Sequence, residues 1–241
     1  MGRIQQAKKN IAFGFVSNFV ILFMNFLQRT IFILILGQTL TGVNSLFSGI
    51  LSMLSMAELG IGSALNYSLY KPVANKDYEK IKSYMLFYKK AYRVIAAVIT
   101  IIGLALTPFL KYLVKNPGDN TIQELTVYYL IFLFNTVSTY FVAYKYSLVN
   151  AEQRNYIQTN ITTITKIVTV VVQIVVLLVT RNFLIYLLAQ AAVELLQKIF
   201  VSRYLNRLYP YLCEKKVQKL EKEETAVIIT KTKALMCHKI G

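Results

Sequence analysis

The chain has few of the residues from which catalytic and metal sites are usually built. Its 241 residues include one histidine, His238, and two cysteines, Cys213 and Cys237. The cysteines form no CxxC pair and fit no zinc pattern, so we expect two reduced thiols on the cytosolic side. No GxxxxGK[ST], GxSxG or HExxH motif occurs. The sequence therefore predicts no metal, no cofactor and no built-in ATPase.

Charged residues are also scarce, at 16%, whereas hydrophobic residues reach 56% and the mean hydropathy is +0.49. The apolar residues form runs of about 20 or more, a length that suits the roughly 30 Å hydrocarbon core of a bilayer. A soluble domain of this size has more charge and shorter apolar runs. The first run is too long for a cleavable signal peptide, and we expect it to be a retained membrane span.

Six apolar runs predict an all-α membrane protein whose six transmembrane helices form one bundle. The expected spans are 11–37, 45–69, 92–114, 125–149, 161–180 and 183–205, within a bundle domain of residues 1–205. Two longer basic linkers are expected at 71–90 and from 206 to about 233. Short outer turns are expected at Asn116–Asp119 and Thr180–Asn182 because Pro, Gly and Asn favour turns. Pro72 is expected to help end the second span.

The distribution of basic residues predicts the orientation. With the N-terminus in the cytoplasm, the inner segments hold 23 Lys and Arg residues and the outer segments three. This asymmetry agrees with the positive-inside rule. Six spans return the C-terminus to the cytoplasm. Since the basic residues lie between apolar runs, the net charge of +16 indicates membrane orientation, and no nucleic-acid partner is expected.

A polar stripe marks the first span. Gly14, Asn18, Asn25 and Arg29 lie within about 60° of one another on a helix. The guanidinium of Arg29 suits bidentate binding of phosphate or carboxylate. The alternative is that Arg29 extends to the outer headgroups or pairs with a structural carboxylate. Asn18, Asn25 and Arg29 are our substrate-binding candidates in this span.

Three further ionisable residues lie within the expected spans. Glu58 is a candidate for coupling or gating, or for a structural bond. Lys166 is a substrate-binding candidate that either lines a cavity open to the cytoplasm or extends to the headgroups. Glu194 is a second coupling or gating candidate, although Lys198 at i+4 also allows a local ion pair. Gln173 lies too deep to reach water and must find a partner in the bundle.

Polar stripes on several spans, each beside a lipid-compatible face, indicate a bundle that encloses a hydrated cavity. The only two aspartates, Asp77 and Asp119, are expected on opposite sides of the membrane. They cannot form the loop-borne metal site of a membrane glycan-transfer enzyme. Secondary transport is therefore favoured over enzymatic chemistry.

The first 95 residues or so resemble the opening of Wzx-type oligosaccharide flippases, members of the multidrug, oligosaccharidyl-lipid and polysaccharide exporter superfamily. The segments that carry the likeness are Arg29–Phe32, Gly42–Phe47, Leu51–Ala64, Tyr70–Pro72 and Phe87–Arg93. Beyond them the likeness rests on hydropathy and span order.

The resemblance implies movement of undecaprenyl-pyrophosphate-linked sugar units across the bacterial inner membrane, for capsule, lipopolysaccharide O-antigen or exopolysaccharide assembly. It implies two six-helix bundles, about twelve to fourteen spans in all, that rock around a cationic cavity. By this likeness Arg29 contacts the pyrophosphate or an anionic sugar and Glu58 couples or gates, with Lys166 a weaker candidate. Expected partners are membrane lipid, the lipid-linked oligosaccharide, and either a C-terminal half or a second copy.

Residues Ala234–Gly241 resemble the start of a seventh span, so we expect a truncated N-terminal half that is inactive unless the cavity is completed. Three alternatives remain open. A multidrug efflux antiporter of the same superfamily would use intramembrane carboxylates as its main ionisable groups. A membrane-embedded glycan-transfer enzyme would need an acidic loop site, and a non-catalytic membrane scaffold would need neither.

Overall fold

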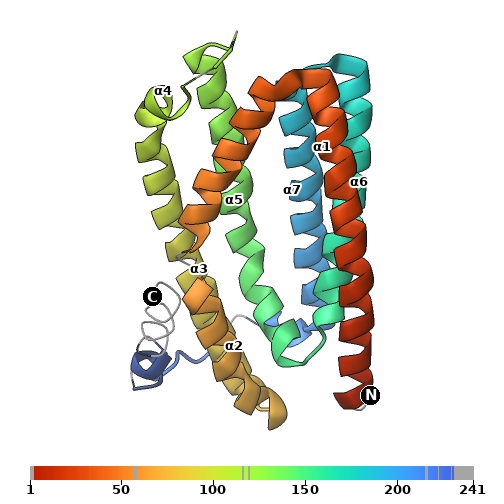
Figure 1. The fold of residues 1–241 in the computed structure, drawn as a ribbon. Coiled ribbons are helices and arrows are strands. Elements are labelled where there is room, and N and C mark those ends of the chain that lie inside the picture. Colours follow the sequence, from red (N-terminus) through yellow and green to blue (C-terminus); the bar gives the residue numbers. More distant parts are fainter. Residues whose placement is uncertain are drawn as a thin grey trace.

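The computed structural model describes residues 3–56, 59–115, 117–118, 120–214, 217–221, 223–228 and 230. Every regular element within these residues is helical, as the sequence predicts (Figure 1). The α-helices are α1 (Arg3–Met56), α2 (Leu59–Ala74), α3 (Tyr78–Leu106), α4 (Leu110–Leu113), α5 (Ile122–Ala151), α6 (Asn155–Thr180) and α7 (Phe183–Leu208). Two short 3₁₀ helices are η1 (Thr107–Phe109) and η2 (Pro210–Cys213).

Five of the described helical segments are long and apolar enough to cross a membrane. They are Gln5–Met56, Tyr78–Leu113, Ile122–Ala151, Asn155–Thr180 and Phe183–Leu208. Large apolar side chains project from them: Phe15 and Phe19 are 81% and 74% exposed. A surface of this kind is costly in water and suits lipid. These features are compatible with a multi-pass membrane protein.

Helix α1 differs from the prediction of two spans separated by a linker at 38–44. The chain is helical on both sides of Gly37, and only Gly37 departs from helical geometry, with φ 80° and ψ 179°. Glycine lacks the Cβ that disfavours this conformation in other residues. Figure 1 shows α1 rising, turning at its upper end and descending again. The first expected span and the second span as far as Met56 thus lie in one bent helix, and residues 59–69 of the second span lie in α2. The described helices therefore do not reproduce a count of six.

The expected linker at 71–90 is also mostly helical. Helix α2 continues through Pro72 to Ala74, so Pro72 lies inside the helix that it was expected to help end. Only residues 75–77 are non-helical, and Asp77 then caps α3 by accepting a hydrogen bond from the Lys80 amide at 3.0 Å. The basic residues of this segment, apart from Lys76 in the turn, therefore lie on helices. Helices α5, α6 and α7 are each longer than the span predicted for them.

The described residues turn at both places where the sequence predicts short turns. Gly118 adopts φ 62° and the Asn120 amide donates to the Pro117 carbonyl; Asn116 and Asp119 lie outside the described residues. Arg181 adopts a left-handed conformation between α6 and α7, and Asn182 caps α7. The hairpin between these two helices is as tight as the spacing predicts.

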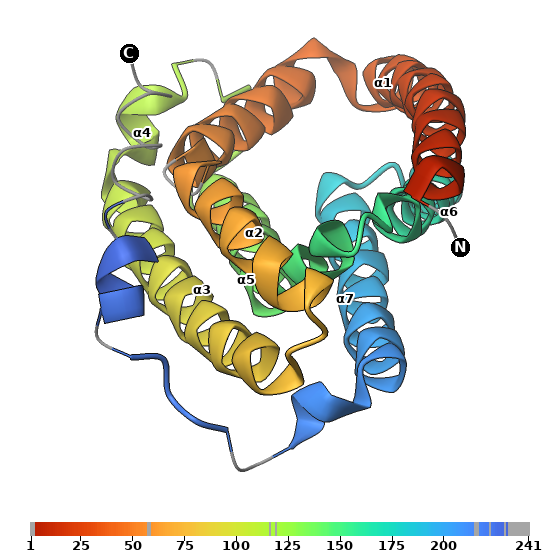
Figure 2. The same ribbon diagram turned by 90° about the horizontal axis from the view of Figure 1, so that it is seen from below.

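The helices form one bundle in which α5 packs between α3 and α7, while the first arm of α1 packs along α6. Seen end-on in Figure 2, α6 and the first arm of α1 lie on one side and α2 and α3 on the other. Aromatic contacts fill the core near the bend of α1, where Phe32 packs edge-on against Phe183 and Tyr186. The second arm of α1 is anchored on α5 through Phe47 and Tyr129.

The predicted linker from 206 to about 233 is described only in part. Residues 223–228 form a helical segment beside α3 (Figure 2), in which Glu224 forms an ion pair with Lys80 at 2.5 Å. Residues 231–241 lie outside the described residues, and with them Cys237, His238 and the expected start of a seventh span.

Candidate functional site

A continuous chain of hydrogen-bonded side chains, hereafter the polar chain, links α1, α6 and α7 inside the bundle. The Nζ of Lys166 donates to Gln28 Oε1 at 2.7 Å. Gln28 Nε2 donates in turn to Gln173 Oε1 at 2.8 Å and to the hydroxyl of Tyr186 at 2.5 Å. Gln173 Nε2 then donates to Gln190 Oε1 at 3.0 Å. Gln28 therefore joins the first arm of α1 to both other helices.

The polar chain ends at an ion pair on α7. Gln190 Nε2 donates to Glu194 Oε1 at 2.8 Å, and Glu194 Oε2 lies 3.6 Å from the Nζ of Lys198. Lys198 also donates to Ser138 Oγ at 2.7 Å and to the Asn135 carbonyl at 3.1 Å, which ties α7 to α5. The ion pair that the i+4 spacing allows is thus present, and through Lys198 it joins α5 to the polar chain as a fourth helix.

The three amides of the polar chain are oriented in one direction. Each donates toward Glu194 and accepts from the side of Lys166. This arrangement places the amide dipoles in line between a cation and a carboxylate, which strengthens each bond. Gln173 is fully buried, so its amide depends on these partners, as the sequence predicts. The polar chain holds two lysines and one carboxylate and is net cationic.

Helix α1 presents three different faces along its first arm. One row is buried against α6: Ser17 lies 2.5 Å from Thr163, and Gln28 joins the polar chain. Asn18, Asn25 and Arg29 lie about 100° around the helix from that row. All three are exposed, and in the described part of the chain they have no hydrogen-bond or ion-pair partner. We call these three residues the polar flank.

Between residues 16 and 27, the opposite side of the buried row carries no polar residue. Val16, Phe23 and Leu27 occupy it, about 100° around α1 in the other sense. One side of the α1–α6 contact is therefore suited to lipid and the other to water or a polar ligand. This asymmetry is the main functional signal on α1, because an exposed Arg in a spanning helix is expensive in hydrocarbon.

The structure divides the predicted site residues into two groups. Lys166 and Glu194 belong to the polar chain and contact other helices. The ammonium group of Lys166 donates to Gln28 on α1, a contact that the sequence did not predict. Asn18, Asn25 and Arg29 form the polar flank. Glu58 lies outside the described residues.

Two residues important to this arrangement were missed in the sequence. Gln28 lies off the Asn18–Arg29 stripe and was not among the predicted site residues. A signal was available: Ser17 and Gln28 are eleven positions apart, which places both on one helix face. Lys145 was counted only as an inner basic residue, yet it is 6% exposed and held between α5 and α7. No sequence pattern distinguishes it from other basic residues near a helix end.

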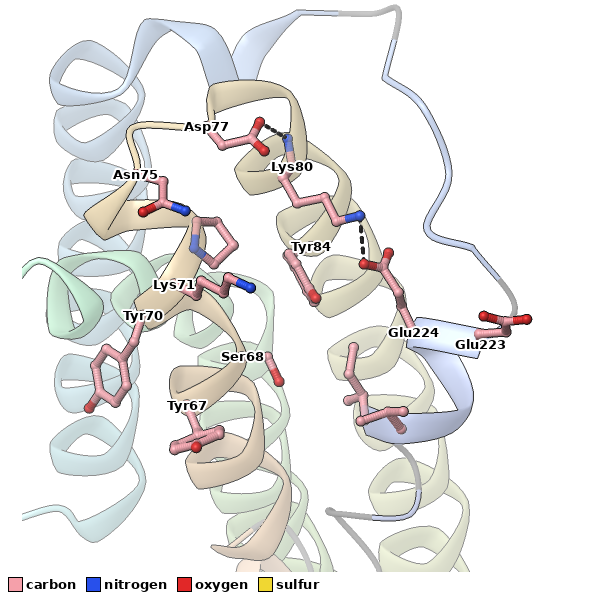
Figure 3. A pocket seen from close by; sticks show the side chains of 13 residues that line it. Tyr67, Ser68, Tyr70, Lys71, Asn75, Asp77, Lys80, Tyr84, Glu223 and Glu224 are labelled. Carbon is pink, nitrogen blue, oxygen red and sulfur yellow. Dashed lines mark hydrogen bonds and ion pairs between the residues drawn. The ribbon is translucent and has the colours of Figure 1, made fainter.

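A large hollow lies away from all of these residues. A cavity of about 780 Å³ lies between α2, α3 and residues 223–228 (Figure 3). Lys71 and Tyr84 extend toward it, and the Lys80–Glu224 ion pair spans its edge. Its lining mixes tyrosine, lysine and carboxylate side chains and matches none of the predicted site residues.

Comparison with known proteins adds no identification, because no family model, curated protein or solved structure matches the chain.

Proposed function

We propose that the chain forms one bundle of a flippase for undecaprenyl-pyrophosphate-linked oligosaccharide. The observation that supports this most is the polar flank, where two carboxamides and an unpaired guanidinium stand exposed along a membrane-length helix. A cationic group at this depth requires water or an anion as its partner. A groove that admits a lipid-linked pyrophosphate supplies both.

In this proposal the chemistry of the polar flank matches the ligand. Arg29 binds the pyrophosphate through its planar fork of N–H donors. Asn18 and Asn25 offer donors and acceptors to sugar hydroxyls along the same face. Uncharged donors favour passage because they bind the sugar without trapping it.

The polar chain has a positioning role in this mechanism. It connects the first arm of α1 to α6 and α7 through Gln28, so it fixes the rotation of α1 and hence the direction of the polar flank. Glu194 is the one carboxylate in the polar chain. A change in its protonation would weaken the pair with Lys198 and the bond to Gln190. This is how we assign a coupling role to it.

The topology belongs to the same proposal. We place α1 across the inner membrane twice, with the turn at Gly37 on the outer side and both ends of the chain in the cytoplasm, so that the bundle has six crossings. The groove is completed by a second bundle, either a C-terminal half or a second copy. Drug efflux driven by carboxylates is less well supported, since Glu194 is already paired with Lys198.

The test is transport by reconstituted protein. Vesicles containing the chain as a dimer, the form in which a second copy completes the groove, are loaded with a fluorescent undecaprenyl-pyrophosphate oligosaccharide, and outer-leaflet label is quenched by dithionite. We expect faster loss of inner-leaflet label than in protein-free vesicles, abolition by Arg29→Ala, and partial recovery in Arg29→Lys. Phe23→Ala, on the apolar side of α1, is the matched control and keeps the rate. Equal rates in Arg29→Ala and the unsubstituted chain would remove the polar flank from the mechanism.

A further inference from the structure

A second cationic site lies near the end of the bundle that carries the chain's N-terminus, remote from the polar flank. A pocket of about 650 Å³ opens between α3, α5, α7 and η2. Lys89 and Arg93, one turn apart on α3, and Lys145 on α5 line one part of it. Ser202 and Asn206 on α7 line another, and Phe141 and Leu212 add apolar surface. Three cations from two helices thus converge on one hollow.

The centre of this pocket holds a buried ammonium group with only neutral partners. The Nζ of Lys145 donates to Asn206 Oδ1 at 2.7 Å, to Ser202 Oγ at 2.8 Å and to the Ser202 carbonyl at 3.2 Å. Lys145 is only 6% exposed. Burying a cation without an opposite charge is costly. An anion in the pocket would offset that cost.

No described carboxylate forms an ion pair with Lys145, Lys89 or Arg93. Glu214 is the one acid in the lining, and its Oε2 is bound by Lys82 at 2.7 Å. The other described ion pairs engage Glu79, Glu152, Glu194 and Glu224 with lysines or an arginine outside the pocket. Lys89 and Arg93 are exposed and form no hydrogen bond or ion pair with any described residue. The pocket thus keeps an uncompensated positive charge.

The position of the pocket along the expected spans indicates which kind of anion it binds. Arg93 lies close to the expected inner limit of its span, and Asn206 lies just past the end of another. The cations are therefore at the level of lipid headgroups, and exposed Phe141 points to an adjoining apolar environment. An amphiphile with a phosphate group fits both parts.

We propose that this pocket binds the phosphate group of an anionic phospholipid in the leaflet next to α3, α5 and η2. Lys89 and Arg93 donate to the phosphate oxygens. The buried ammonium of Lys145, held by Ser202 and Asn206, adds a third positive charge to the pocket. The acyl chains leave past Phe141 into the bilayer. This site shares no residue with the polar flank or the polar chain, so it is independent of the flippase proposal.

The test measures lipid affinity of purified full-length protein in detergent by titration with fluorescent short-chain phosphatidylglycerol. We expect Lys89→Gln/Arg93→Gln to weaken binding at least tenfold. The control Lys90→Gln/Arg203→Gln removes the same charge from exposed positions outside the pocket and should stay within about twofold. Equal weakening in both double variants would mean non-specific attraction and would overturn the proposal.

Two competitors identify the source of the phosphate. Phosphatidylcholine of the same chain length should compete at least tenfold more weakly, because its headgroup is zwitterionic. Inorganic phosphate should compete only at millimolar concentration, since it has no acyl chains. Competition by inorganic phosphate at the concentration of phosphatidylglycerol would show a soluble anion as the ligand and contradict a lipid site. Neither outcome depends on transport activity.

Discussion

At the scale of single residues, Gln28 has the most consequential position in the molecule. One side chain satisfies the ammonium of Lys166, the amide of Gln173 and the hydroxyl of Tyr186, on two other helices. Asn25 lies three residues earlier on the same helix and contacts none of them. Substituting each of these two amides in turn distinguishes the polar side chain that holds the helices together from the one that we assign to ligand binding.

Replacing Gln28 by Leu should destabilise the bundle by about 1–2 kcal/mol, because half-buried Lys166 loses an acceptor and buried Gln173 loses a donor. Thermal unfolding in detergent measures the change. Asn25→Leu is the matched control and should leave the melting temperature unchanged. Equal stability of both variants would mean that the polar chain contributes nothing to the packing of α1.

The residue scale is also where sequence reasoning was least complete. The stripe of Asn18, Asn25 and Arg29 was visible from helical spacing, as was the ion pair of Glu194 with Lys198. The hydrogen-bond partner of Lys166 could not be predicted in this way, because its acceptor lies 138 positions earlier in the chain. Which distant helix a buried amide meets depends on packing, and spacing within one helix carries no information on it.

At the scale of elements, the bend of α1 decides how many times the chain crosses the membrane. The apolar pattern predicted that the first span ends at residue 37, where the helix bends, but it also predicted a short linker at 38–44 that is helical in the structure. The helix resumes at once because one glycine absorbs the whole change of direction. Hydropathy reports the length of apolar runs and is insensitive to a turn made by a single residue.

Gly37→Ala should therefore destabilise the protein by about 1–2 kcal/mol, because an L-residue is strained at φ 80° even with open space around its Cβ. Gly42→Ala supplies the control. Gly42 is helical within α1 and equally open, so alanine there should be neutral or stabilising by up to about 1 kcal/mol. Urea or thermal unfolding would contradict this interpretation if both variants behaved alike.

At the scale of the whole molecule, the all-helical membrane architecture followed from composition, because long apolar runs have few alternatives in a bilayer. The arrangement of the helices did not follow from it. The contact of α1 with α6, and the position of α5 between α3 and α7, pair segments distant in sequence. The orientation rests on the distribution of Lys and Arg.

Cysteine labelling in intact cells tests that orientation and the double crossing of α1. Cys213 and Cys237 are first replaced by serine, and single cysteines are then placed at Gln38, Lys115 and Lys76. Gln38 and Lys115 line one small pocket at the same end of the bundle. A membrane-impermeant maleimide should label both and spare Lys76→Cys until the cells are opened. Protection of Gln38→Cys in intact cells would contradict the outer turn.

The central claim is that the polar flank of α1 faces a hydrated groove while the opposite side faces lipid. Spin labels at Asn18, Asn25 and Arg29 test it most directly in cysteine-free protein in bilayers, with labels at Val16, Phe23 and Leu27 as the matched set. We predict that the first set collides mainly with a water-soluble nickel complex and the second mainly with oxygen. Preferential collision of both sets with oxygen would contradict the account, because the polar flank would then face hydrocarbon.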